Sequence, residues 1–321
     1  MTEVATKPDA PKRQRTKPKR NLQLLAPLIG ALLGIAMLLY PVISTRQHNA
    51  EQQRIANESL HAVTNLTPVQ KNTLLEDADE YNKELASGLI LDPFIEDVAP
   101  NSPEYKQYLQ KLNADEVMGT VRVPAVNINL PIYHGTFDDV LGKGVGHLFG
   151  SSLPVGGVDT HSVLTGHTGL PNATLFDHLD KVKKGDDIYL SVAGRHLKYK
   201  VNDIRVVKPE ETSSLVRQPG RDLVTLITCT PYGINSHRLL VTGERVPMEK
   251  TDEAKVLTPQ PIENPWEWWM IGLVAGASVA GLLVLLLFYM IFFGGRKKDE
   301  EEDENQTPAA AAEEIPENTE Q

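Results

Sequence analysis

The chain has 321 residues and carries 32 Lys and Arg against 42 Asp and Glu, which gives a formal net charge of −10 at pH 7. A chain this acidic is repelled by the phosphate backbone, so we expect no nucleic-acid partner. The charge is unevenly spread, because residues 1–20 sum to +5 and residues 296–321 sum to −7. The two tails therefore differ from the middle of the chain.

Two long uncharged blocks predict membrane helices. The first, from Leu22 to Ile43, has about 22 residues, enough at 1.5 Å per residue to cross a hydrocarbon core of roughly 30 Å. It is longer than the apolar region of a signal peptide and lacks a small-x-small cleavage site, so we predict an uncleaved transmembrane helix at 22–44. The second block predicts a transmembrane helix at 269–293. Tryptophans cluster at its start, where indole rings favour the headgroup layer.

Basic residues flank both predicted spans. They are Lys12, Arg13, Arg15, Lys17, Lys19 and Arg20 before the first span, and Arg296, Lys297 and Lys298 after the second. Short basic flanks stay on the cytoplasmic side, so both ends should be cytoplasmic: a basic tail at 1–21 and an acidic tail at 294–321. This topology places residues 46–268 outside the cell and makes the membrane a partner of the chain.

The segment at 45–115 is predicted to be a helical N-terminal region. Sparse apolar positions at helical spacing predict helices at 47–62 and 68–86, the second starting at Thr67-Pro68. Asp92-Pro93-Phe94 interrupts the pattern, and Ser102-Pro103 opens a further short helix that should reach Leu112.

From Val117 onward, apolar residues alternate with polar residues in several short segments. Such alternation occurs in Val121–Val123, Ile128–Ile132, Ile188–Val192, Leu197–Val201 and Ile204–Val206, with Gly, Asn, Asp and Pro clusters between. Short strands at this spacing predict a mainly β domain, a sandwich or a barrel, at 116–248. The residues that follow, 249–268, are Pro-rich and predict a stalk that leads to the second span.

The single cysteine, Cys229, excludes an internal disulfide. It ends the apolar run Leu223–Thr228 and precedes Thr230-Pro231-Tyr232-Gly233, where a strand must stop. A cysteine at a strand end beside a loop is expected to be accessible. The alternative is a small buried core residue, because free cysteine is among the most buried residue types.

A second strand-like run, from His237 to Gly243, follows the loop and brings Arg238 near the thiol. A fixed cation favours the thiolate and is expected to lower the pKa of Cys229. The alternative for Arg238 is an ordinary surface ion pair.

Five histidines compete as the partner of the thiol: His134, His147, His161, His167 and His237. Spacing does not choose between them, although His167 ends a strand-like stretch between two glycines. One cysteine and scattered histidines do not make a zinc-binding pattern, so we predict no metal and no cofactor.

Residues 225–241 read Thr-Leu-Ile-Thr-Cys-Thr-Pro-Tyr-Gly-Ile-Asn-Ser-His-Arg-Leu-Leu-Val, which resembles the active-site signature of the sortases, and within them the class C, pilin-polymerising branch. The resemblance extends to residues 117–135 and 164–171. It implies a closed eight-stranded β-barrel. It also implies that Cys229 is the nucleophile, His167 the catalytic histidine and Arg238 the catalytic arginine.

Class C relatives carry a lid with an Asp-Pro-aromatic motif, which Asp92-Pro93-Phe94 resembles. The resemblance implies a lid at about residues 88–98, in which Asp92 pairs with Arg238 and Phe94 covers Cys229. Without the resemblance, the same tripeptide equally predicts a turn that ends a helix.

The resemblance implies a cysteine transpeptidase. It would cleave a Leu-Pro-x-Thr-Gly-like sorting signal through a thioester on Cys229 and join the product to the lysine amine of a pilin. The expected partners are pilin precursors and the membrane, with cell-wall precursor as a further candidate. Two alternatives remain open: a sortase that attaches proteins to peptidoglycan, and a membrane-anchored interaction module without enzymatic activity.

Overall fold

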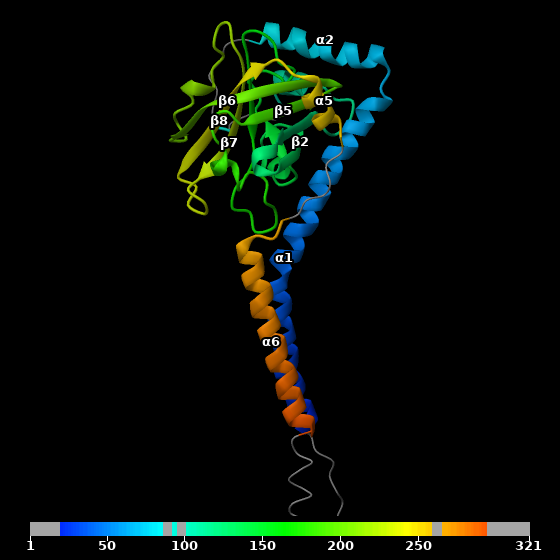
Figure 1. Cartoon of the computed structure of the whole chain (residues 1–321), viewed down its shortest axis with the longest axis vertical. Coiled ribbons are helices and arrows are strands. Elements are labelled where there is room, and N and C mark those ends of the chain that lie inside the picture. The colour runs from blue at the N-terminus through cyan, green and yellow to red at the C-terminus, as the bar shows by residue number, and fades with distance from the viewer. Residues whose placement is uncertain (1–19, 86–91, 95–100, 259–264, 294–321) are drawn as a thin grey trace, which may run out of the picture. The chain divides into compact units, whose positions relative to one another are not determined.

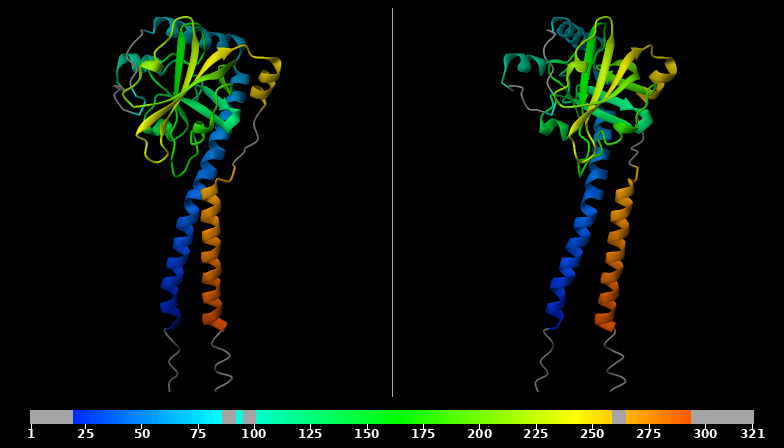
Figure 2. Two further views of the ribbon diagram at one scale, coloured as in Figure 1. Left: turned by 60° about the vertical axis from the view of Figure 1, so that its left-hand side comes forward. Right: turned by 90° about the vertical axis from the view of Figure 1, so that its left-hand side faces the viewer.

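The computed structural model describes residues 20–85, 92–94, 101–258 and 265–293, which fall into two compact units. One unit comprises residues 1–40 and 267–321, and the other comprises residues 41–266. The described part of the first unit contains the beginning of helix α1 and helix α6 (Trp268–Phe293), which run side by side (Figures 1 and 2). Within the described residues, α1 and α6 are both long and apolar enough to span a membrane.

Helix α1 runs without a break from Arg20 to Asn65, so the segments expected at 22–44 and 47–62 form one helix. The sequence between them contains no glycine or capping signal that would end the helix. Helix α2 (Pro68–Glu84) begins as predicted at Thr67. The Thr67 hydroxyl and the Gln70 side chain form a capping box there, with Pro68 in the first turn.

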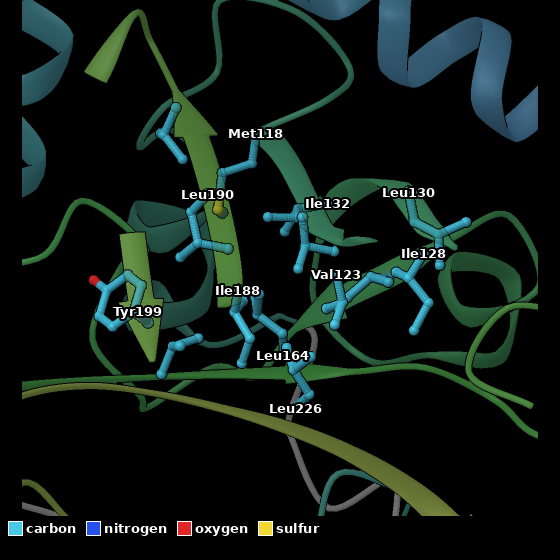
Figure 3. Packing of buried hydrophobic residues seen from close by; sticks show 14 of the residues in the cluster. Met118, Val123, Ile128, Leu130, Ile132, Leu164, Ile188, Leu190, Tyr199 and Leu226 are labelled. Atoms are coloured by element: carbon cyan, nitrogen blue, oxygen red, sulfur yellow. The ribbon is translucent and has the colours of Figure 1, made fainter. Parts of the chain in front are cut away.

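Eight strands close into a barrel in the order β1-β2-β3-β4-β7-β8-β6-β5, which confirms the predicted fold. Their bounds are β1 Gly119–Val123, β2 Ile128–His134, β3 Val145–His147, β4 Thr160–Thr165, β5 Asp187–Val192, β6 Arg195–Val207, β7 Asp222–Thr230 and β8 His237–Val246. Side chains from alternate strand positions fill the interior, and Figure 3 shows part of this packing around Ile188, Leu190 and Leu226. The short helices are α3 Pro103–Tyr108, α4 Asp138–Leu141, η1 Pro124–Val126, η2 Leu179–Lys181 and η3 Ser213–Leu215.

Strand β6 unites two segments that the sequence suggests are separate. Leu197, Tyr199 and Val201 alternate in one phase, whereas Ile204 begins a second phase. The pairing of β6 with β8 shifts register between Val201 and Asp203. A β-bulge adds one residue and therefore moves the apolar positions by one, which makes a single strand read as two.

Part of the predicted Pro-rich stalk at 249–268 is helical instead. Helix α5 (Lys250–Leu257) contains no proline and packs on the barrel through Asp252. The Tyr189 hydroxyl donates to Asp252 at 2.9 Å, and the Lys198 ammonium contacts it at 2.8 Å. The bond from Lys198 lowers the pKa of Asp252 to about 2 and outweighs the cost of burial.

Helix α3 is shorter than predicted, because it ends at Tyr108, before Leu112. Its tyrosines turn toward the barrel, and the Tyr108 hydroxyl lies 3.0 Å from Nδ1 of His147, whose Nε2 lies 2.8 Å from the Ser152 carbonyl. His147 is fully buried, and this burial holds its pKa at about 4. His147 is thus a neutral structural residue of the fold.

Acid should weaken the fold through His147. As the pH falls below 6.5, the unfolded chain protonates this residue, whereas the folded chain keeps it neutral until about pH 4. We expect the free energy of unfolding to drop between these values by at most about 1.4 kcal/mol per pH unit from this group. In melting experiments, His147→Gln should show a smaller loss between pH 7 and pH 5 than the wild type. His61→Gln, on an exposed part of α1, serves as the control, and equal losses in all three proteins would contradict the prediction.

Candidate functional site

The candidate site lies where strand β7 ends between β4 and β8. Val224 and Leu226 of β7 belong to the barrel core, so Ile227 and Cys229 lie in the opposite, outward-facing phase at this end of the strand. Cys229 is paired in register with Arg238 of β8. Directly opposed residues of antiparallel strands present their side chains on the same face, so Arg238 is a neighbour of the thiol.

His167 follows β4 on the other side of β7. Thr165 is in register with Ile227 in this parallel pair, and the ladder continues because the Gly166 amide donates to the Ile227 carbonyl at 3.1 Å. Two residues further along both strands, His167 comes level with Cys229. The structure therefore brings His167, Cys229 and Arg238 together across three neighbouring strands.

The glycine before His167 allows a close approach. A Cβ atom at Gly166 would lie 2.7 Å from the Phe176 ring. The Phe176 amide in turn donates to the His167 carbonyl at 3.1 Å. Any larger residue at position 166 would displace the ring and with it the backbone of the histidine.

The other four candidate histidines have different places. His147 is the buried residue of the fold described above, and His161 is buried with its Nε2 2.7 Å from the Thr225 hydroxyl. His134 contacts the Lys111 carbonyl at 2.7 Å. His237 precedes Arg238 on β8, so its side chain points to the opposite face of the strand from Arg238. Among these histidines, His167 is thus the one that the strand register brings level with the thiol.

Asp92 and Phe94 contact the side chains on either side of Cys229. Arg238 donates to both oxygens of Asp92, at 2.8 Å from Nε and 2.6 Å from Nη2, in a buried bidentate pair. The Phe94 ring lies 5.6 Å from the His167 ring and 4.9 Å from the Arg238 guanidinium carbon. It packs against the apolar cluster that contains Ile227.

Of the contacts implied for a lid, the Asp92–Arg238 pair is present, whereas Phe94 contacts the neighbours of Cys229. Asp92 pairs with Arg238, and Phe94 lies over the two side chains that flank Cys229. Pro93 occupies the turn between them. The rest of the lid expected at 88–98 falls outside the described residues.

The thiol is less accessible and less acidic than the sequence suggests. Cys229 is 9% exposed, although it lies at a strand end. Burial raises the pKa of Cys229, the Arg238 charge lowers it, and the Asp92 charge raises it again, so the net shift is upward. The predicted effect of Arg238 is present, but burial and Asp92 outweigh it.

His167 is also shifted toward its neutral form. Burial lowers the pKa of His167, and the charge of Asp138 at the start of α4 opposes this shift. Asp138 did not stand out in the sequence, because a carboxylate at the start of a short helix is common. Asp177 was missed as well. It accepts hydrogen bonds from the Gly169 amide at 2.7 Å and the Thr168 hydroxyl at 3.0 Å, which fixes the turn after His167.

Comparisons with known proteins agree with this geometry. The family model for the sortase domain matches residues 121–246. The chain is similar to sortase C-1 from Actinomyces oris, with 61% sequence identity to the protein in its crystal structure. The match covers 56% of this chain and 99% of that chain, with a TM-score of 0.54. The chain belongs to the sortase family. Sortases are cysteine transpeptidases, so the chain is assigned to a family of enzymes.

Two further sortases extend the comparison. The sortase C structure from Streptococcus pneumoniae is 43% identical, with 61% of this chain and 97% of that chain covered and a TM-score of 0.55. Sortase A of Streptococcus agalactiae is 32% identical over 140 residues, which are 43% of this chain and 55% of that relative. The chain thus spans little more than half of this curated relative. The sortase C neighbours confirm the resemblance to class C.

Proposed function

We propose that the chain is a membrane-anchored class C sortase that polymerises pilins. The observation that carries the proposal is the alignment of His167, Cys229 and Arg238 across β4, β7 and β8 beneath Asp92 and Phe94. The pneumococcal sortase C is described together with its pilin substrate specificity, which supports a pilin as the substrate class here. Sorting-signal-bearing proteins are accordingly the expected partners.

The arrangement supports acyl transfer through a thioester. The Cys229 thiolate attacks the threonine carbonyl of a Leu-Pro-x-Thr-Gly-like signal, and His167 as imidazolium protonates the departing glycine amine as the peptide bond breaks. A pilin lysine amine then attacks the thioester and gives a proton to neutral His167. The carbon–sulfur bond breaks, which releases Cys229 and leaves an isopeptide bond between subunits.

Arg238 has two uses in this scheme. In the closed site its guanidinium binds Asp92 at two points, so it is occupied and unable to bind substrate. Release of Asp92 frees two donors beside Cys229, where they stabilise the negative charge that develops on the carbonyl oxygen. Opening of the lid thus precedes chemistry as a gating step.

The membrane placement is part of the proposal. Two apolar helices, α1 and α6, are long enough to span a membrane. Basic residues precede the apolar part of α1 and follow α6. This charge pattern supports cytoplasmic termini and a barrel outside the cell, where protein substrates with sorting signals are exposed.

A reconstituted polymerisation assay tests the function. Full-length protein in detergent micelles should convert a purified pilin that carries a sorting signal and an acceptor lysine into a covalent ladder on denaturing gels. No cell-wall precursor is supplied, so ladder formation separates a polymerase from a sortase that anchors proteins to peptidoglycan. A second reaction contains cell-wall precursor as well. Cleavage of the signal without a ladder in the first reaction, and transfer of the pilin to the precursor in the second, would refute the polymerase assignment.

Replacing Arg238 by Lys should lower turnover about 100-fold, because lysine keeps the charge but loses the forked donors that reach two oxygens at once. The measurement is kcat for transpeptidation of a sorting peptide, with a melting curve for each protein. Arg195→Lys is a matched control, since Arg195 forms a similar two-point pair with Asp79 away from Cys229. Turnover near the wild-type value in Arg238→Lys would contradict the prediction, because it would mean that the positive charge at position 238 is enough for transpeptidation.

A further inference from the structure

The second half of helix α1 presents a polar stripe to the barrel. Thr45, His48, Asn49 and Gln52 are spaced at i, i+3, i+4 and i+7, so they share one face of the helix. Thr45 and Gln52 are each 2% exposed. A helix normally docks through apolar side chains. Thr45, His48 and Asn49 on this face instead form directional hydrogen bonds, which fix the position of the groups that they contact.

Asn49 holds one loop of the barrel at two points. Its Nδ2 donates to the Thr174 hydroxyl at 2.7 Å, and its Oδ1 accepts from the Thr174 amide at 3.0 Å. One turn earlier, the Thr45 hydroxyl donates to the Pro171 carbonyl at 3.2 Å. Three hydrogen bonds thus join α1 to the segment at 171–174.

This segment belongs to the loop that carries His167. Two residues after Thr174, the Phe176 amide donates to the His167 carbonyl, and Asp177 then closes the turn at Thr168 and Gly169. The backbone held by Asn49 is therefore the same short stretch that fixes the backbone of the histidine.

The stripe also reaches the loop on the other side of the histidine. His48 Nε2 lies 2.9 Å from the carbonyl of Gly142, and Gly142 is the C-cap residue of α4. Asp138 at the start of this helix provides the charge that raises the pKa of His167 against the effect of burial. Helix α1 thus contacts both of the loops that shape the surroundings of His167.

We propose that Asn49 is a positioning residue for His167, acting through Thr174. The inference rests on the proposed function, because it takes His167 as the group that transfers protons. Helix α1 is continuous from Arg20 to Asn65, so one helix carries both a membrane-spanning apolar stretch and the clamp on the catalytic loop. The helix is therefore part of the catalytic framework as well as an anchor.

Loss of the clamp should affect proton transfer more than substrate binding. A misplacement of about 1 Å in a catalytic group can cost about 100-fold in rate. A partial loosening of the loop is therefore expected to lower kcat about tenfold. KM for the sorting peptide should change less than twofold, because Asn49 contacts Thr174 and not the substrate. The rate of Cys229 alkylation should also stay within twofold of the wild type.

The experiment uses the full-length enzyme in detergent micelles, a sorting peptide and an amine acceptor. Asn49→Ala removes both bonds to Thr174, whereas Thr174→Val removes only the bond to the hydroxyl and should have the smaller effect. The double variant should be no worse than Asn49→Ala alone. Thr174→Ser keeps the hydroxyl and should keep the wild-type kcat. Arg54→Ala, on the exposed face of the same helix, is the control for general damage.

The outcomes separate the inference from the function on which it rests. A tenfold loss of kcat in Asn49→Ala, with KM and alkylation retained and with Thr174→Ser active, supports the positioning role. An unchanged kcat in Asn49→Ala, or equal losses of kcat in Arg54→Ala, overturns it. Wild-type enzyme that does not turn over would instead overturn the proposed function and the inference together.

Discussion

Replacing Cys229 by Ala is expected to abolish both thioester formation and transpeptidation, with a loss of at least about 1,000-fold. The reason is chemical, because the proposed reaction passes through a covalent bond to this sulfur and the chain contains no second cysteine. The fold should persist. Removal of one sulfur atom from the outward face of β7 leaves the barrel core untouched.

Activity and stability need to be measured on the same preparation. We would follow release of the glycine-terminated fragment from a sorting peptide and record a melting curve for each protein. The control is Val158→Ala, which truncates an exposed side chain before the start of β4, at the other end of that strand from His167. Residual transpeptidation in Cys229→Ala above the level of an enzyme-free mixture would refute the assignment of the nucleophile.

Replacing Asp92 and Phe94 together by Ala should expose and acidify the thiol. In the closed site burial raises the pKa of Cys229, and the Asp92 charge raises it further. Removal of the Phe94 ring reduces the burial of the thiol, and removal of Asp92 leaves the Arg238 charge unopposed. Both changes favour the thiolate. Each unit by which the pKa falls increases the thiolate fraction at neutral pH about tenfold, so alkylation should speed up by about tenfold or more.

The measurement is the rate of Cys229 modification by a small thiol reagent from pH 6 to pH 10. The midpoint of this profile should move to lower pH in the double variant, since the pKa of the thiol falls. Asp79→Asn provides a matched control, because Asp79 also forms a bidentate pair with an arginine but lies away from the thiol. A profile in the double variant that coincides with the wild type would remove the case for a lid.

The alternating strands predict a mainly β domain, a sandwich or a barrel, and the resemblance to the sortases implies the closed barrel that the structure shows. The sequence predicts β6 less well, since a bulge near Asn202 reverses the alternation and divides one strand into two apparent ones. Strand β3 escapes notice for a different reason. It has only three residues, one of which is glycine, and so short a segment shows no detectable alternation.

The candidate site could be predicted in part. Adjacent strands suggest that Cys229 and Arg238 are neighbours, and the structure confirms this placement. His167 could not be selected by spacing, because its position depends on a parallel pairing between β4 and β7, which are far apart in sequence. The resemblance to sortases supplied what local pattern could not.

Two features of the site depend on contacts that no sequence pattern marks. The net pKa of Cys229 follows from burial and from Asp92, both set by tertiary packing. The buried side of α1 is mostly polar around Asn49, whereas amphipathic analysis searches for apolar stripes. The sequence therefore identifies α1 as a helix but not the loop that it holds.

The proposed reaction depends on a thioester between Cys229 and the threonine of a sorting signal. The most direct test is intact-mass and fragment mass spectrometry of the Asp92→Ala, Phe94→Ala variant after incubation with a Leu-Pro-x-Thr-Gly peptide and no amine acceptor. We expect a mass increase equal to the acyl fragment ending at threonine, located on Cys229 and lost when an amine is added. An adduct on another residue, or cleaved peptide with no adduct at any time point, would contradict this expectation.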